Sequence, residues 1–440
     1  MADNKVIFSM SGVGKMVPPK QMILQDIYLS FFYGAKIGVL GINGSGKSTL
    51  LRIIAGVDKD YVGEITFVKG LRFGYLEQEP RLDPNKSVRE NVEDGLVETM
   101  TLLKRFDEVS MAMAEPMSDK ALQTLLDEQG RLQDAIDAVD GWSIDRTIEI
   151  AGDALRLPAW DARIENLSGG EIRRVALCKL LLSAPDVLLL DEPTNHLDAE
   201  SVGWLERYLH QFKGTVIAVT HDRYFLDNVA GWILELDRGR GIPYEGNYSN
   251  WLEQKDKRLL QEAREESSHK KELESELEWV RTNPGARRKR NVARLKNYEE
   301  LASREFQKRQ ETLSLYIPPG ERLGEDVIQF KNVSKTLGNK LLYENLSFTI
   351  PRGAIVGIVG PNGAGKTTMF KLISGVEQPD AGTVHIGNTV DLGYVNQNRD
   401  ALNNNKTIWE EISDGLDIIS VGSFQMPSRA YVGRFNFKGA

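Results

Sequence analysis

"GINGSGKS", residues Gly41–Ser48, sets the architecture to expect of this 440-residue chain. It completes the β-branched run "KIGVLG" and matches the pattern G-x-x-x-x-G-K-[ST]. Glycines in such a loop let backbone N–H groups converge on phosphate oxygens, and the helix that follows adds partial positive charge at its N-terminus. The stretch therefore predicts a buried strand, then a phosphate-binding loop, then a helix.

The same pattern returns as "GPNGAGKTT", residues Gly360–Thr368. The stretches around the two loops align without a gap, so that Lys47 pairs with Lys366 and Gln78 with Gln397, each 319 residues apart. The run "AIVGIVG" again predicts a buried strand ahead of the second loop. A repeat of this length indicates duplication of a whole domain. We therefore expect an α/β fold with tandem P-loop domains.

The composition is that of a soluble globular protein, with 41% hydrophobic and 27% charged residues. No apolar run approaches the ~18 residues that span a bilayer, and the N-terminus lacks a signal-peptide core. The single cysteine, Cys178, fits a reducing compartment and is interpreted as a small buried residue. A net charge of −8 argues against a generally basic nucleic-acid binder. These features predict a cytoplasmic protein without a membrane segment.

Acidic residues follow the apolar run in "VLLLDEPTNHLD". At the end of this strand, Asp191 could hold the hydration shell of a metal ion, and Glu192 could polarise the water that attacks the bound nucleotide. In the phosphate loop, Lys47 would contact the β- and γ-phosphates, and the Ser48 hydroxyl would ligate Mg²⁺. A second apolar strand, "TVIAVTHD", places His221 at the same edge as a γ-phosphate ligand.

The turn "LSGGE", residues Leu167–Glu171, opens the helical run "EIRRVALCKLLL". Ser168 is a good N-cap, and Gly169 and Gly170 permit close approach of the backbone to an anion. The simpler interpretation is only a capped helix. In the second copy, the equivalents of Ser168, Asp191 and His221 would fall near 487, 510 and 540, beyond Ala440. We therefore expect the second domain to be truncated as given.

Residues between the two copies are rich in helix formers and charged on most faces, and "TNPG" at Thr282–Gly285 interrupts them. We predict a first P-loop domain over 1–242 with a helical arm at about 95–140, a charged helical hairpin over 243–322, and a second P-loop domain over 323–440. The hairpin's turn carries seven basic residues and no acid over 281–298. It is interpreted as a solvated turn or, because these charges gather at a projecting tip of a net acidic chain, as a contact with the phosphate backbone of a polyanion. The seven are Arg281, Arg287, Arg288, Lys289, Arg290, Arg294 and Lys296.

The ordered set of phosphate loop, Gln78, "LSGGE", "LLLDEPTNHLD" and "VTHD" resembles an ATP-binding-cassette domain. The resemblance implies a head-to-tail pair in which each ATP lies between the phosphate loop of one cassette and the "SGG" turn of the other, here called the signature turn. It also implies that Gln78 senses metal and water, that Asp198 lies at the domain contact, and that His221 is the switch histidine. The catalytic pair would be Glu192 and His221, and the cofactors ATP and Mg²⁺.

Three sets of residues carry these assignments. The expected ATP-binding residues are Gly41, Ile42, Asn43, Gly44, Ser45, Gly46, Lys47, Ser48 and Thr49 in the first copy, and Gly360, Pro361, Asn362, Gly363, Ala364, Gly365, Lys366, Thr367 and Thr368 in the second. The expected metal-site residues are Ser48, Gln78, Asp191, Thr367 and Gln397. The signature turn is Ser168, Gly169, Gly170 and Glu171.

Tandem cassettes around a charged helical hairpin resemble the ABC-F class of translation factors. The likeness includes "DNVAGWILELDRGRGIPYEGNYSNWLEQKD" and "PSRAYVGRFNFKG" and runs through essentially the whole chain. It implies a ribosome-bound ATPase at the exit site, whose hairpin contacts peptidyl-tRNA, whose arm contacts the L1 stalk of the rRNA, and whose nucleotide state gates translation.

Two other functions fit the nucleotide motifs. One is the ATPase subunit of a membrane transporter, which leaves the basic hairpin without a purpose. The other is ribosome protection against antibiotics, which the modest hairpin tip disfavours. We expect a monomer, with ATP-dependent pairing of two chains through their first cassettes as the alternative.

Overall fold

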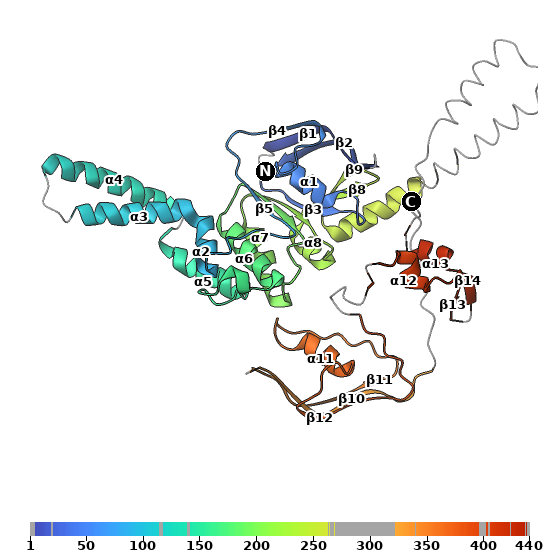
Figure 1. Cartoon of the computed structure of the whole chain (residues 1–440). Coiled ribbons are helices and arrows are strands. Elements are labelled where there is room, and N and C mark those ends of the chain that lie inside the picture. Colours follow the sequence, from blue (N-terminus) through green and yellow to red (C-terminus); the bar gives the residue numbers. More distant parts are fainter. Residues whose placement is uncertain are drawn as a thin grey trace, which may run out of the picture. The chain divides into compact units, whose positions relative to one another are not determined.

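The computed structural model describes residues 5–18, 21–113, 118–138, 141–262, 264, 268, 322–338, 340–395, 402–403, 405–422, 424–435 and 437. The chain divides into two compact units, Met1–Glu265 and Glu266–Ala440 (Figure 1). Within the described part, no helix combines the length and the apolar character needed to cross a membrane.

The first unit is built on a six-stranded sheet with the order β5-β6-β7-β3-β8-β9. Its strands are β3 (Lys36–Leu40), β5 (Phe73–Leu76), β6 (Val187–Asp191), β7 (Thr215–Val219), β8 (Trp232–Asp237) and β9 (Arg240–Glu245). Only the β8–β9 pair is antiparallel. β6 and β7 are buried at every residue, as expected of central parallel strands covered on both faces.

The core of this unit consists of two apolar clusters, and successive side chains of β6 belong alternately to one and the other. Val187 and Leu189 belong to one apolar cluster, whereas Leu188 and Leu190 belong to the other, because successive side chains of a strand point to opposite faces. Cys178 lies in the second cluster, fully buried, and burial raises the pKa of its thiol to about 12. The prediction of a small buried cysteine is confirmed.

A three-stranded antiparallel sheet, β2-β1-β4, adds its apolar residues to the first of these clusters. Its strands are β1 (Val6–Val17), β2 (Gln21–Phe32) and β4 (Val62–Phe67). The stacked rings of Phe8 and Phe31, with centroids 4.2 Å apart, link β1 to β2. Helix α1 (Lys47–Ile54) contributes Leu50, Leu51, Ile53 and Ile54 to the same cluster.

Among the described residues, seven further helices precede residue 230 in the first unit, and most of them contribute to the second apolar cluster. They are α2 (Val88–Glu93), α3 (Val97–Ala112), α4 (Asp119–Ala138), α5 (Ile144–Ala154), α6 (Gly169–Leu182), α7 (Ala199–Gln211) and α8 (Arg223–Val229), with short 3₁₀ turns at Asp94–Leu96, Gly141–Ser143 and Ile164–Asn166. Helices α3 and α4 run side by side as a projecting arm (Figure 1). The Arg105 guanidinium on α3 pairs with Glu128 on α4 at 2.8 Å. This arm occupies the stretch where a helical insertion is predicted.

A helix over residues 248–262 leaves the sheet edge where the predicted hairpin begins. The buried Glu235 carboxylate on β8 accepts hydrogen bonds from Lys255 Nζ at 2.5 Å and from Trp251 Nε1 at 3.2 Å. One turn further on, Arg258 donates to Tyr244 and Asp237. These bonds fix the start of the helix to strands β8 and β9. The rest of the hairpin, including its seven predicted RNA-binding residues, lies outside the described residues.

The second unit contains the antiparallel sheet β11-β10-β12 and the hairpin β13-β14. Its elements are β10 (Asp326–Leu337), β11 (Lys340–Pro351), α11 (Lys366–Ile373), β12 (Ala381–Ile386), α12 (Ile408–Ser413), β13 (Ile418–Val421), β14 (Phe424–Pro427) and α13 (Ser428–Arg434). Phe330, Val333, Leu372 and Ile373 form its small core. β10, β11, β12 and α11 thus repeat β1, β2, β4 and α1.

The predicted buried strand "AIVGIVG" is wrong for this structure. Residues 354–360 form no strand, and Ile355 and Val359 are 101% and 85% exposed. The equivalent β3 lies between β7 and β8, which supply its hydrogen bonds, and its Val39 side chain is buried in the first apolar cluster. Among the described strands of the second unit, none pairs with residues 354–360. An apolar run becomes a central strand only where such neighbours are present.

Candidate nucleotide-binding site

The first phosphate loop joins β3 to α1, as predicted. Gly44 and Gly46 have φ angles of 80° and 94°, a conformation that glycine adopts without strain. Lys47 Nζ donates hydrogen bonds to the carbonyl oxygens of Gly41 at 2.6 Å and Ile42 at 3.2 Å. Burial lowers the pKa of Lys47, and the charges of Glu192 and Asp191 act against that shift. The lysine thus lies folded over the loop that is expected to hold phosphate.

Two carboxylates lie opposite this loop, at the end of β6. Asp191 is 3% exposed, and its Oδ2 atom is buried with no hydrogen-bond partner in the described part of the chain. Glu192 has a φ of 53°, and its main-chain N–H donates to the Val219 carbonyl at 2.7 Å. Because a buried oxygen without a partner is costly, Asp191 is a strong candidate for a metal ligand.

His221 lies beside Glu192, just beyond the end of β7. Its Nε2 atom is 3.6 Å from Glu192 Oε1, and its main-chain N–H donates to Oε2 at 3.4 Å. Burial raises the pKa of the Glu192 carboxyl, and His221 is the largest opposing influence. A raised pKa moves this carboxylate toward the range in which it can accept a proton from water.

A cavity of about 580 Å³ brings these groups together. It is lined by ten of the predicted residues: Asn43, Gly44, Gly46, Lys47, Ser48, Thr49, Gln78, Asp191, Glu192 and His221. Gly41, Ile42 and Ser45 do not line it but form the loop behind it. The cavity also includes Ile23, Asn195 and Val219, which the sequence analysis did not single out. Asn195 could have been found from its place in "DEPTNHLD", four residues after Asp191.

The signature turn has the local structure that its sequence predicts. Ser168 Oγ accepts a bond from Glu171 N–H, and the Glu171 carboxylate accepts one from Ser168 N–H at 2.8 Å. This capping box begins α6. The Ser168 hydroxyl is also the main cause of the lowered pKa of Glu171. Ser168 and Gly169 are exposed and do not line the cavity. Within this unit, the turn and the phosphate loop are therefore not brought together.

Asp198 is held by contacts inside the first unit. Its carboxylate caps α7 by accepting from Ser201 N–H at 3.0 Å, and it pairs with Arg156 Nε at 2.9 Å. The residue is 7% exposed. These contacts give it a structural role alongside the domain contact that the resemblance implies.

The second phosphate loop has the same internal bonds as the first. Lys366 Nζ donates to Gly360 at 2.6 Å and to Pro361 at 2.9 Å, and Gly363 and Gly365 have φ angles of 75° and 96°. Tyr343 Oη donates to the Gly365 carbonyl. The predicted residues Gly360–Thr368 thus form a loop and the start of α11. Gln397, the predicted fifth member of the metal set, lies outside the described residues.

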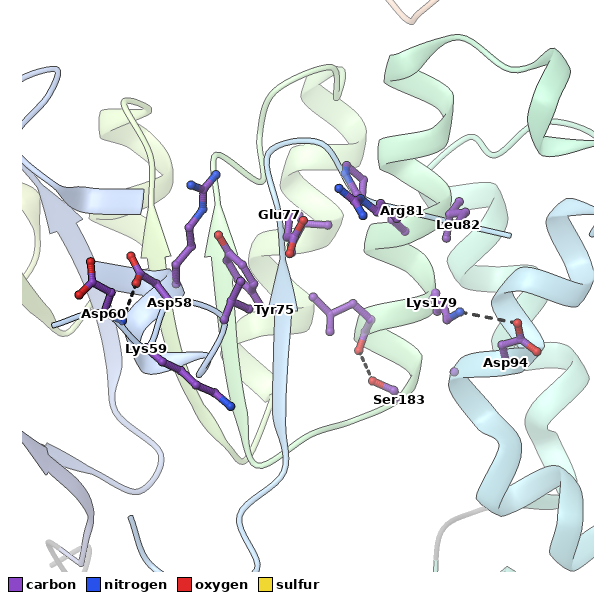
Figure 2. Close-up of a pocket in the computed structure, with 17 residues that line it drawn as sticks. Asp58, Lys59, Asp60, Tyr75, Glu77, Arg81, Leu82, Asp94, Lys179 and Ser183 are labelled. Carbon is purple, nitrogen blue, oxygen red and sulfur yellow. Dashed lines mark hydrogen bonds and ion pairs between the residues drawn. The ribbon is translucent and has the colours of Figure 1, made fainter. Parts of the chain in front are cut away.

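A larger cavity of about 1150 Å³ lies on another face of the first unit (Figure 2). Tyr75 and Glu77 approach it from β5 and the loop that follows, and the Lys179–Asp94 ion pair closes it on the helical side. It contains none of the predicted phosphate-loop or acidic residues. Size alone would therefore misplace the nucleotide site, which the chemistry of its side chains identifies.

Comparison with known proteins places these features in a family. A family model described as ABC transporter matches residues 24–195 and 343–436, and a second model with that description matches residues 234–315. The chain is 61% identical over 433 residues to the energy-dependent translational throttle protein EttA of Escherichia coli (strain K12), covering 98% of this chain and 78% of the relative. The protein of that name in Haemophilus influenzae is 60% identical over 436 residues, covering 99% of this chain and 78% of the relative. The ATP-binding protein ChvD of Rhizobium radiobacter is 56% identical over 269 residues, covering 61% of this chain and 94% of the relative.

Proposed function

The chain belongs to the ATP-binding-cassette family that includes the translational throttle proteins, and on that premise we propose that it is a ribosome-associated translation factor that hydrolyses ATP. The observation that carries the proposal is the 61% identity with EttA over 98% of the chain. That span includes the phosphate loops, the acidic pair and the segment between the cassettes. A likeness confined to the phosphate loops would have indicated only a nucleotide-binding fold.

We assign the binding of Mg²⁺-ATP to side chains and N–H groups of the first cassette. The loop N–H groups and Lys47 would bind the phosphates, and Ser48 and Asp191 would supply oxygen ligands to the metal. The buried, unpartnered Oδ2 of Asp191 fits this assignment. Bound Mg²⁺ would neutralise negative charge on the phosphates. Glu192 would accept the proton of the attacking water, with Gln78 and His221 orienting the groups around it.

The specific binding partners on the ribosome are proposed from the family resemblance. We assign the basic stretch over 281–298 to contact with peptidyl-tRNA and rRNA, and the α3–α4 arm to contact with the L1 stalk. Support for the first assignment is the concentration of positive charge in a net acidic chain. Binding near the exit site would let the nucleotide state gate translation. We further propose a cytoplasmic location and a monomer in the absence of ATP.

Ribosome co-sedimentation tests this function. A Glu192→Gln chain should bind ATP without hydrolysing it and remain with ribosomes in ATP but not in ADP, whereas the wild type should dissociate as ATP is consumed. Failure of the variant to show ATP-dependent retention would reject the proposal. Recovery in the membrane fraction with an integral partner, unaffected by loss of residues 281–298, would instead favour the ATPase subunit of a transporter.

A further inference from the structure

Arg173 lies in the second turn of α6, beyond the signature turn, and is 6% exposed. Its Nη1 atom donates to the carbonyl oxygen of Gln78 at 2.5 Å. Its Nη2 atom donates to the carbonyl oxygens of Asp191 and, at 2.9 Å, of Glu192. One guanidinium therefore joins the loop after β5 to the end of β6.

The three carbonyl groups belong to residues that line the 580 Å³ cavity, although Arg173 does not line it. Burying a guanidinium costs free energy unless its N–H groups are hydrogen-bonded; both Nη atoms of Arg173 are bonded, whereas its buried Nε has no partner among the described residues. Burial lowers the pKa of Arg173, and the charges of Asp191 and Glu192 oppose that shift. The planar fork of arginine can bond several carbonyl oxygens at once, whereas a lysine ammonium lacks that geometry.

We propose that Arg173 is a positioning residue for the nucleotide site. Its guanidinium holds the main chain of Gln78 at a fixed distance from that of Asp191 and Glu192. This inference rests on the proposed ATPase function and deepens it. All three residues line the cavity proposed to hold the nucleotide, and their main-chain oxygens accept hydrogen bonds from the single guanidinium of Arg173. Pairing between β5 and β6 ends at Leu76 and Leu190. Without Arg173, the loop carrying Gln78 and the end of β6 would therefore lose the guanidinium hydrogen bonds that connect them beyond the sheet.

A residue that only stabilised the core would change the unfolding temperature and leave the binding chemistry intact. A positioning residue also changes how nucleotide affinity depends on Mg²⁺, since Gln78 and Asp191 belong to the proposed metal site. Loss of groups that orient metal ligands typically costs about 10–100-fold in metal affinity. The Mg²⁺ dependence of ATP binding therefore separates the two roles.

The test compares Arg173→Met and Arg173→Lys with wild type and with Lys179→Ala. Lys179 lies on the same helix, has a 32% exposed side chain and pairs with Asp94 outside the nucleotide cavity. Calorimetric titrations with ATP over a Mg²⁺ series give the Mg²⁺ concentration for half-maximal binding. Thermal unfolding of each variant is recorded in parallel.

For Arg173→Met, half-maximal ATP binding should require at least about 10-fold more Mg²⁺ than for wild type. The Mg²⁺ requirement of Arg173→Lys should lie between those two values, and that of Lys179→Ala should equal the wild-type value. The affinity of Arg173→Met for ATP in the absence of Mg²⁺ should stay close to the wild-type value. An unchanged Mg²⁺ requirement in a folded Arg173→Met chain would overturn the positioning role while leaving the proposed function intact. Absence of Mg²⁺-ATP binding by wild type would overturn both.

Discussion

The Nε2 atom of His221 lies 3.6 Å from Oε1 of Glu192, and the main-chain N–H of the same histidine donates to Oε2. One residue thus contacts both oxygens of the carboxylate that is proposed to activate water. The two residues are brought together because they follow the neighbouring parallel strands β6 and β7. Parallel strands place their carboxyl ends at one edge of the sheet, where ligands of α/β folds bind.

The Glu192→Gln substitution should lower the ATP hydrolysis rate about 10²–10⁴-fold, the range found for general acid–base groups. ATP binding should persist, because the amide fills the same space and the phosphate loop is untouched. Steady-state phosphate release and equilibrium ATP binding measure the two effects. Loss of binding together with hydrolysis would contradict the separation of these roles.

Stability should depend on pH through Glu171. The Ser168 contacts lower the folded-state pKa of this carboxyl, so the charged form stabilises the fold above the unfolded pKa of about 4.3. That contribution is lost as pH falls through the folded pKa. Urea unfolding should therefore show wild type more stable than Glu171→Gln at pH 7, with the gap closing below about pH 4. A gap that did not change with pH would contradict the contribution of the Glu171 charge.

Gly46→Ala should destabilise the first unit. The residue has a φ of 94°, and an added Cβ would lie 2.9 Å from Leu24 Cδ2. The left-handed backbone alone costs about 1–2 kcal/mol for a residue with a side chain. Chemical denaturation followed by circular dichroism measures the change.

Gly203→Ala is the matched control for Gly46→Ala. Gly203 lies inside α7, and the nearest atom to its added Cβ is Arg207 Nη1 at 3.7 Å. Alanine in a helix interior is favoured over glycine by about 1 kcal/mol, so this variant should be stabilised. Destabilisation of both variants by the same amount would refute the conformational argument.

Lys255→Met should loosen the helix over 248–262 from the cassette. The Glu235 carboxylate, whose side chain is 6% exposed, would lose its cationic partner and keep Trp251 as a donor. We expect about 1–3 kcal/mol of destabilisation, the usual cost of an unsatisfied buried polar group. Glu235→Gln combined with Lys255→Met should recover part of it, because no buried charge remains. Hydrogen exchange over residues 248–262 would show whether the loss is local.

Local patterns in the sequence predicted much of this molecule. Glycines followed by a lysine specify a loop whose N–H groups converge, and both copies adopt it with the same pair of lysine bonds. The uninterrupted apolar run in "VLLLD" predicted a buried strand that ends in a carboxylate. "SGGE" predicted the cap of α6. Each of these features depends on residues close together in the chain, so periodicity and turn chemistry were sufficient.

Only the tertiary structure decided the features that depend on distant neighbours. "KIGVLG" and "AIVGIVG" have similar patterns, yet the first is a central strand between β7 and β8 and the second is exposed coil. In the sequence, Arg173 is one of several charged residues in a helical run. Only the fold shows that its guanidinium donates to three main-chain carbonyl oxygens. The burial of a strand and the partners of a cation depend on hydrogen-bonding and packing groups elsewhere in the chain. A local sequence pattern does not specify where those groups lie in the folded protein.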